Sequence, residues 1–399
     1  MTQVSTDHSR ATLAGDHSHG SAPAADKADK PRSFELSAFP IPGGREEDWR
    51  FTPIARMADL FADELTGSAP DITFDGVRLG EGAADLPFDV VFDSCPCVGS
   101  VGAPSDRTAV VAWANRGTPT CVTISESLER PYVFEIVGNS SEAAAQHLTL
   151  NITEGVTATV VLRHTGTARL AQTVEIDVAE GANLTVVTTQ EWDEDAVHAA
   201  AHRISAGKDA VVKHIAVTLG ADLVRLTTDV EFAGEGADVE LLGLYFTDAG
   251  QHHEHRLFME HRLPNCVSDA TYKGALQGKD AHAVWVGDVL IGHDATGTDT
   301  YELNRNLLLT EGARADSVPN LEIETGEIAG AGHASATGRF DDEQLFYLMS
   351  RGVPEDLARR LVVRGFFAEL INRIGVPEVQ DRLIAAIEAE LDQTMALVK

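Results

Sequence analysis

The sequence predicts a mainly β protein whose centre is a β-helix, a solenoid of stacked β-coils, and two features carry this prediction. Short runs of Val, Ile, Leu and Thr alternate with polar residues, as at 147–152 and 174–178, which is the pattern of half-buried strands. A unit made of a Gly-containing turn and such a strand begins at Glu154, Glu180 and Ala206, at two successive intervals of 26 residues. A fixed period in this range indicates a solenoid.

The same unit returns at wider intervals, beginning at Glu235, Gln277 and Glu311. In each copy Gly supplies a turn that a side chain would obstruct, and the β-branched residues after it stack on the next coil. No helical segment between these strands is long enough for a βαβ crossover, which argues against a doubly wound sheet. A β-sandwich ranks second because it would not demand the repeated turn. We place the β-helix core at 131–339.

The segments before the core differ from it and from each other. Residues 1–33 are predicted to be a disordered tail, because they have almost no large apolar side chains to offset the entropy of ordering. The tail contains His17 and His19, a residue type that binds transition metals, although such flexible tails more often bind nothing specific. Residues 34–130 predict an N-terminal domain of mixed helical and irregular structure, with a short helix over 54–65.

The last segment, 340–399, is predicted to be a C-terminal helical domain. Its first helix begins near Asp341 and ends near Gly352, Pro354 opens the second helix, and Pro377 opens the third. The second helix has an unusually broad apolar face. This face has one stripe of Val362, Phe366 and Leu370 and another of Val363, Phe367, Ile371 and Ile374. Packing on the solenoid explains part of the face, and a partner protein explains the remainder.

The composition argues against nucleic-acid and membrane partners. Lys and Arg total 31 against 62 Asp and Glu, and the net charge of -31 repels phosphate backbones and anionic headgroups. The sequence has no apolar run of about 18 residues and no secretory signal at its start, so we expect a cytoplasmic protein. Its four cysteines are too few and too scattered for a disulfide framework, and we expect free thiols.

Two histidine-containing segments are candidates for chemistry. On a strand, His253, His255 and His261 would share one face and could gather a metal, but their spacing matches no defined metal motif. The preferred interpretation is therefore solvated or ladder-stacked strand residues. His333 lies in a segment of small residues, 329–338, which another backbone or a cofactor can approach closely. A neutral imidazole there is a competent ligand for iron or zinc.

Ordered strings of the sequence resemble the SufB/SufD family of iron-sulfur cluster assembly scaffold proteins. The strings are Gln251-His252 with His261, Tyr272-Lys273-Gly274, Trp285-Val286-Gly287, Asn304-Arg305-Asn306-Leu307-Leu308-Leu309, Pro319-Asn320-Leu321-Glu322-Ile323, His333, and Leu345-Phe346-Tyr347-Leu348-Met349-Ser350-Arg351-Gly352. The element Trp49-Arg50-Phe51-Thr52-Pro53 looks like the N-terminal signature of the SufD branch. With it, the resemblance covers nearly everything after the tail.

The resemblance implies a right-handed parallel β-helix between helical terminal domains, and a non-catalytic scaffold role. In the family, SufB and SufD form a heterodimer that binds two copies of the SufC ATPase through the C-terminal helical regions, and the assembly builds an iron-sulfur cluster. The stripe of Val362, Phe366 and Leu370 is then the expected SufC contact. A homodimer of the isolated chain and a flavin in the complex both stay open.

The resemblance also gives His333 a role. The family's proposed cluster site lies at the SufB–SufD interface and takes a cysteine from SufB and a histidine from SufD, whose position His333 matches. We therefore expect a transient cluster or iron at that interface and none stably bound by the isolated chain. Near the position of the SufB cysteine this chain has Asn304 and no thiol, which favours the SufD branch. Gly332-His333-Ala334 departs from the Ser-His-Gly that is common in that branch.

Two other functions are weighed against the scaffold. Sequence motifs for nucleotide hydrolysis, serine hydrolases and zincins are absent, and nothing in the sequence requires an enzyme. A β-helix carbohydrate-active enzyme would need a row of carboxylates or basic residues that form a groove along one solenoid face. A histidine-rich iron carrier would use His253, His255 and His261 together with His17 and His19.

Overall fold

The structure, a computed structural model, describes residues 30–80, 86–92, 97–340 and 342–397. It is 48% strand and 16% helix, and its centre is a parallel β-solenoid of about 8 turns, so the predicted fold class is confirmed. Most of the predicted tail, including His17 and His19, lies outside the described residues. The tail prediction is too long at its C-terminal end, because Arg32 forms an ion pair at 2.7 Å with the buried Glu260.

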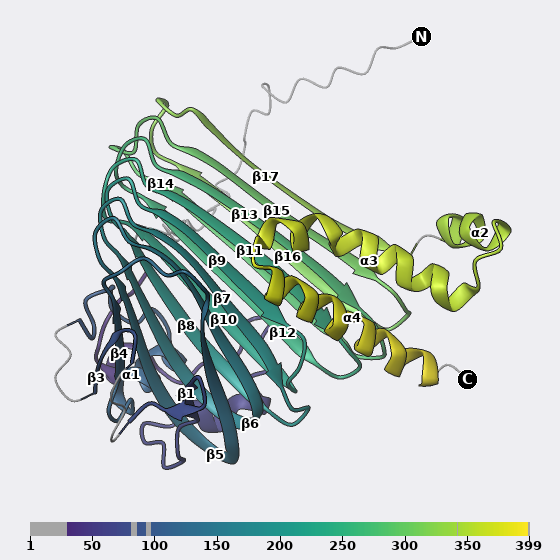
Figure 1. Cartoon of the computed structure of the whole chain (residues 1–399), viewed down its shortest axis with the longest axis horizontal. Coiled ribbons are helices and arrows are strands. Elements are labelled where there is room, and N and C mark those ends of the chain that lie inside the picture. Colours follow the sequence, from purple (N-terminus) through teal and green to yellow (C-terminus); the bar gives the residue numbers. More distant parts are fainter. Residues whose placement is uncertain (1–29, 81–85, 93–96, 341, 398–399) are drawn as a thin grey trace, which may run out of the picture. The chain divides into compact units, whose positions relative to one another are not determined.

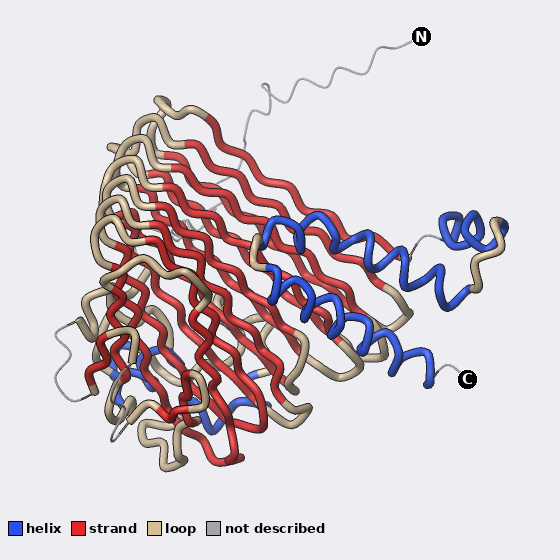
Figure 2. The backbone as a smooth tube through the Cα atoms, in the orientation of Figure 1, coloured by secondary structure: helices blue, strands red, loops and turns tan. Residues whose placement is uncertain are grey.

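Two parallel sheets, whose strands alternate along the chain, make up the β-helix (Figures 1 and 2). Sheet A contains β8 (Val197–Ala206), β10 (Leu223–Phe232), β12 (His252–His261), β14 (His282–Ile291) and β16 (Arg314–Ile323). Sheet B contains β7 (Asn183–Trp192), β9 (Val211–Thr218), β11 (Asp238–Thr247), β13 (Val267–Leu276), β15 (Asp299–Leu308) and β17 (Gly330–Arg339). The long strands β5 (Tyr132–Ile152) and β6 (Thr157–Val178) run through both sheets.

The turns of the predicted repeat stack on one another. Gly155 and Gly181 both have positive φ, at 69° and 64°, and each donates its N–H to the carbonyl oxygen of the next turn. The residue in the corresponding place of the third copy is Asp209, with φ 54°, and not the predicted Gly207. Asp tolerates the left-handed region better than most residues do, so it replaces Gly here. The interval between the second and third turns is therefore longer than the sequence repeat indicated.

The N-terminal region packs on sheet A. Its elements are η3 (Leu36–Ala38), η4 (Ile54–Phe61), β1 (Asp71–Phe74), β2 (Val77–Arg78), β3 (Asp89–Val91), α1 (Arg107–Ala114) and β4 (Thr120–Ile124). The helix predicted over 54–65 is a shorter 3-10 segment with a kink at Met57. It ends at Phe61, whose carbonyl oxygen accepts hydrogen bonds from the Arg107 guanidinium. Cys97 and Cys121 are disulfide-bonded, so the expectation of free thiols is wrong for both.

A buried ion pair fixes the N-terminal region to sheet A. Arg225 on β10 donates to Asp106 Oδ2 at 2.6 Å, and its guanidinium carbon lies 4.0 Å from the centroid of the Trp49 ring. Asp106 also caps α1 by accepting a hydrogen bond of 2.9 Å from the Ala109 N–H. Burial alone would raise the pKa of Asp106, but the Arg225 charge and these hydrogen bonds outweigh it and lower the pKa. The Trp49 element noted in the sequence thus has a structural role.

The C-terminal helices are α2 (Asp342–Ser350), α3 (Glu355–Ile374) and α4 (Pro377–Leu397). Helices α3 and α4 lie over sheet B (Figure 1), and their buried faces form one apolar cluster with outward side chains of that sheet. Pro354 and Pro377 open α3 and α4 as predicted, and Gly375 ends α3 in the left-handed conformation. The predicted cap at Asp341 lies outside the described residues. Among the helices that the structure describes, none combines the length and apolar character of a membrane span.

Candidate functional site

The β-helix is open at the end formed by its last coil. Strand β16 bonds to β14 and strand β17 bonds to β15, and in the described ranges neither has a strand on its other side. Every residue of β17 is half-buried or exposed, whereas every residue of β12 is buried. Edge strands with unpaired N–H and C=O groups are ready templates for pairing with another chain. This open end is the first candidate site.

Polar side chains line the interior of the β-helix just inside the open end. Asn304 Nδ2 donates to Tyr245 Oη at 2.9 Å, and Asn306 Nδ2 donates to Asn304 Oδ1 at 2.8 Å. Ser317, from the last strand of sheet A, also bonds to Asn304. Buried polar groups are normally paired in this way. Asn304 is therefore a structural residue that joins the two sheets near the open end.

Glu302 on β15 is the exception to this pairing. Its side chain is 1% exposed, and both of its oxygens lack a hydrogen-bond partner within the part of the chain that the structure describes. Burial, together with repulsion from Asp288, raises the pKa of Glu302 to about 8. The Trp285 Nε1 and the Tyr272 hydroxyl are also buried and have no hydrogen-bond partner there. Sequence reasoning missed Glu302, because a glutamate in an alternating strand is normally solvated.

His333 lies on β17 at the register position opposite Glu302. Its side chain is exposed, and its strand is the outermost one of sheet B. Since side chains of in-register residues on neighbouring parallel strands point to the same face, His333 and Glu302 belong to the same inward column. The structure therefore places the histidine singled out from the sequence at the open end, one strand outside a buried carboxyl group.

The other predicted histidines lie deeper in the β-helix. His253, His255 and His261 are fully buried, so the first alternative of the preferred interpretation, solvated residues, is wrong. The second alternative, ladder stacking, holds for His261, whose ring stacks on Phe232 of the neighbouring strand β10 with ring centroids 4.2 Å apart. Their ring nitrogens lie at 3.0, 3.3 and 2.9 Å from the hydroxyl groups of Thr247, Thr218 and Ser268, respectively. Burial lowers the pKa of His253 and His255 to about 3, which keeps both rings neutral. The described residues contain no group of three or more metal-ligating side chains.

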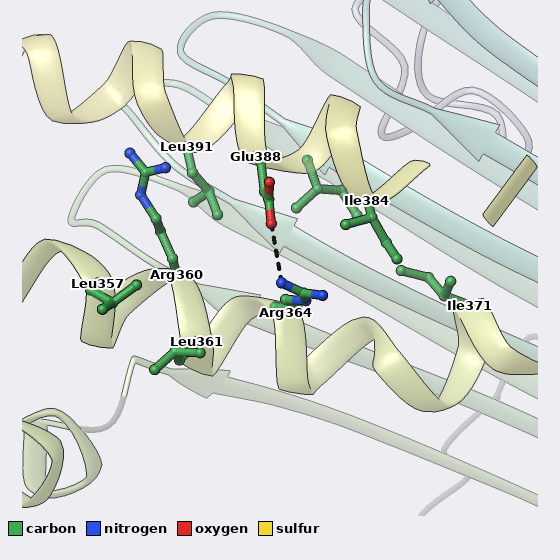
Figure 3. Close-up of a pocket in the computed structure, with 9 residues that line it drawn as sticks. Leu357, Arg360, Leu361, Arg364, Ile371, Ile384, Glu388 and Leu391 are labelled. Atoms are coloured by element: carbon green, nitrogen blue, oxygen red, sulfur yellow. Dashed lines mark hydrogen bonds and ion pairs between the residues drawn. The ribbon is translucent and has the colours of Figure 1, made fainter. Parts of the chain in front are cut away.

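A second candidate site lies between α3 and α4. A cavity of about 150 Å³ lies between the two helices. Figure 3 shows the apolar side chains that line it and the charged groups beside them. Arg364 of α3 pairs with Glu388 of α4 across it at 3.3 Å. Next to it Leu357 and Leu361 are 48% and 44% exposed. Large apolar side chains that stay exposed together on a surface helix mark an interaction surface.

The predicted contact stripe of Val362, Phe366 and Leu370 does not coincide with this surface. Leu370 is fully buried in the cluster against sheet B, so it is not an exposed contact residue in this structure. Val362 and Phe366 are half-buried, and Lys273 of β13 donates to the Phe366 carbonyl oxygen at 3.1 Å. The periodicity identified an apolar helix correctly, but it could not show which side of the helix the sheet would cover.

Comparisons with known proteins agree with this architecture. Residues 134–366 match the SufBD core domain of SUF system iron-sulfur cluster assembly proteins. An iron-sulfur cluster assembly SufBD family protein of Mycobacterium tuberculosis is 51% identical over 385 residues, which cover 92% of this chain and 94% of that protein. Iron-sulfur cluster assembly protein SufD of Escherichia coli is 25% identical over 396 residues, which cover 88% and 89%.

A further SufD, from Bacillus subtilis, is 37% identical over 119 residues, or 30% of this chain and 27% of that protein. The core-domain match runs from β5 into α3, so it includes both the β-helix and its open end. The mycobacterial relative extends the similarity to nearly the whole chain. The chain belongs to the SufBD family of iron-sulfur cluster assembly proteins.

Proposed function

We propose that this chain is a non-catalytic scaffold subunit of the SUF iron-sulfur cluster assembly complex, in which it pairs with SufB and binds the SufC ATPase. The open end of the β-helix carries this proposal. Both β16 and β17 leave one edge unpaired within the described residues, and the large apolar side chains Tyr301 of β15 and Ile323 of β16 are 45% and 46% exposed. Natural proteins cover or blunt such edges, and the matching last coil of another β-helix would cover this one.

The cargo of this pairing is a nascent cluster or iron at the interface. His333 lies on the outermost strand and is exposed, so it can reach a group that is shared with a second subunit. A neutral imidazole is a suitable ligand for iron. The described residues offer no accessible thiol to His333, because Cys97 and Cys121 are disulfide-bonded and Cys266 is buried. The second subunit would therefore supply the sulfur ligands.

The SufC contact is assigned to the exposed leucines beside the α3–α4 cavity. Leu357 and Leu361 lie on the outer side of α3, whereas Val363 and Phe367 on the same helix are buried against sheet B. This division lets the partner bind the outer side without disturbing the packing of the helix on the β-helix. Arg364 and Glu388, which pair across the cavity, provide charged groups for the edge of such an interface.

Co-expression with SufB and SufC of the same organism tests the two contacts separately. The Gly330 N–H donates to the carbonyl oxygen of Thr298, just before β15, and the Phe340 N–H donates to that of Leu308 on β15. By the alternation of a parallel ladder the N–H of Ser335 therefore points to the open edge. Ser335→Pro removes that donor and is expected to abolish co-purification of SufB, whereas Ser335→Thr keeps it. Leu361→Glu is expected to release SufC and retain SufB, with Leu361→Met as its control. Retention of SufB by Ser335→Pro would overturn the pairing proposed for this edge.

One observation favours the carbohydrate-active enzyme as a second candidate. A hollow of about 850 Å³ near the turns is lined by several carboxylates, among them Asp193, Asp195 and Asp222. Asp222, however, is held by an ion pair with Arg56, which occupies its oxygens. Turnover of neutral or acidic glycans by the purified chain, lost in Asp193→Asn, would support this candidate over the scaffold.

A further inference from the structure

The carboxyl group of Glu302 has no hydrogen-bond partner for either oxygen in the described interior. Every other buried carboxylate discussed above has a cationic or hydrogen-bonding partner, as Glu260 and Asp106 do. Glu302 is 1% exposed and has no such partner for either oxygen. A buried polar group without a partner destabilises the folded state, so a structural role alone would be better served by leucine or methionine. The position calls for a ligand that the isolated chain does not contain.

The surroundings of Glu302 are shaped to admit its carboxyl group. Gly287 of β14 faces it across the interior, and a Cβ atom at Gly287 would lie 2.3 Å from Glu302 Oε1 and 2.5 Å from Trp285 Cη2. Real Cβ atoms do not approach so closely, so any side chain at this position would displace Glu302. Gly287 thus leaves space for the carboxyl group. Its register partner on the outer side is Pro319 of the last sheet A strand, β16, so Gly287 lies one strand inside the open end.

The carboxyl group lies beside His333. Glu302 and His333 are register partners on β15 and β17, and strands in a sheet lie about 4.8 Å apart, so the two side chains are adjacent in one inward column. Glu302 lies inside and His333 at the exposed rim. A carboxylate oxygen and an imidazole nitrogen on adjacent strands are two members of a common metal-ligand set.

We propose that Glu302 and His333 together form this chain's half of a binding site for a divalent first-row transition metal ion, with ferrous iron as the cargo. The carboxylate supplies an oxygen ligand from the buried strand β15, and the imidazole supplies a nitrogen ligand from the exposed strand β17 next to it. The remaining ligands come from the subunit that covers the open end. Only the ligands that come from a second subunit rest on the proposed function, because the two ligands of this chain are present without a partner.

Cobalt(II) is the probe for the isolated chain, because its bound form absorbs visible light and oxidises slowly. The number of bound cobalt ions per chain is measured by anaerobic titration followed by absorbance. The wild type is expected to bind one more cobalt ion per chain than the double variant Glu302→Gln, His333→Ala. Each single substitution is expected to weaken binding at this site by about tenfold or more. Ser335→Ala, on the same strand, is the control and should bind as the wild type does. All variants share the histidines of the tail, so any cobalt bound there cancels in the difference.

Iron content of the purified complex with SufB separates failure of this inference from failure of the proposed function. If Glu302→Gln forms a complex of normal size with the iron content of the wild type, Glu302 is not a ligand and the inference is overturned while the pairing stands. If the wild-type chain forms no complex, the pairing fails and the cobalt titration alone decides the site. Equal cobalt stoichiometry in the wild type and the double variant would overturn the site itself.

Discussion

The buried carboxyl group of Glu302 predicts an unusual pH dependence of stability, which Glu302→Gln should remove. Burial raises the pKa of this group to about 8 in the folded chain, from 4.5 for an exposed glutamate. Between these two values the folded state binds a proton that the unfolded state has released. Stability therefore falls as the pH rises through this window. The loss begins near pH 4.5 and is complete near pH 8.

The size of the effect follows from the shift. At pH 7 the pH lies about 2.5 units above the pKa of the carboxyl group in the unfolded chain, and each unit is worth about 1.4 kcal/mol. Keeping the proton on the folded carboxyl group therefore costs the folded state about 3 kcal/mol at this pH. Glutamine carries no titrating proton and nearly the same shape. The difference in free energy of unfolding between Glu302→Gln and the wild type should thus shift by about 3 kcal/mol in favour of the variant between pH 4.5 and pH 7. Any effect of the amide that does not depend on pH cancels in this shift.

The assay is urea unfolding of the metal-free chain, with chelator present, at several pH values from 4.5 to 8. Glu254→Gln is the matched control, because Glu254 is equally buried but lies 3.5 Å from Arg225 and 3.3 Å from Arg256. Burial would raise the pKa of Glu254, but its hydrogen bond with His252 and the two arginine charges lower it. Its substitution should therefore destabilise the chain at pH 7. A difference between Glu302→Gln and the wild type that does not change with pH would refute the reasoning.

Three further predictions concern packing and acid stability. Gly274→Ala should lower the melting temperature by several degrees, because the new Cβ would lie 1.8 Å from the Tyr245 ring. Gly338→Ala is the control and should leave the melting temperature unchanged, because its Cβ would have no atom within 4 Å. Differential scanning calorimetry measures both melting temperatures. Phe367→Ala removes a fully buried ring from the cluster on sheet B and should destabilise the chain by about 3–5 kcal/mol. The C-terminal helices of this variant should then be cleaved faster in limited proteolysis. Resistance equal to that of the wild type would contradict this prediction. Burial lowers the pKa of His214 to about 4, so between pH 6.5 and pH 4 the unfolded state binds a proton that the folded state does not bind. The chain therefore loses stability as the pH falls through this range. His214→Gln should reduce that loss by about 3 kcal/mol, which chemical unfolding at pH 7 and pH 4 would measure.

Much of the fold was predictable because its signals are local. The turn at Gly181 and the alternating strand after it predict one coil of the β-helix. Pro354 and Pro377 predict the starts of two helices, and this prediction does not depend on what the helices pack against. The turn at Asp209 was assigned to the wrong residue, because aspartate adopts positive φ without the sequence signature of glycine. The kink at Met57 depends on packing of the N-terminal region and had no local signal.

The candidate site was predictable only in part. His333 was found because it lies in a recognisable segment, and the structure places it at the open end. Glu302 was missed because an isolated glutamate in an alternating strand is normally a solvated residue, and only the coil around it makes that position an interior one. Leu370 was placed on the partner surface because periodicity gives two apolar stripes on α3 without showing which one the sheet covers.

Hydrogen exchange of the last two strands, with and without SufB, tests the pairing of two SufBD-family subunits most directly. Backbone amides on the outer edges of β16 and β17 have no strand partner within the described chain, so they should exchange rapidly in the isolated protein. Addition of SufB is expected to slow exchange in peptides from 314–323 and 330–339, and to leave peptides from the buried strand β12 unchanged. Formation of a stable complex with unchanged exchange in both edge strands would contradict the account.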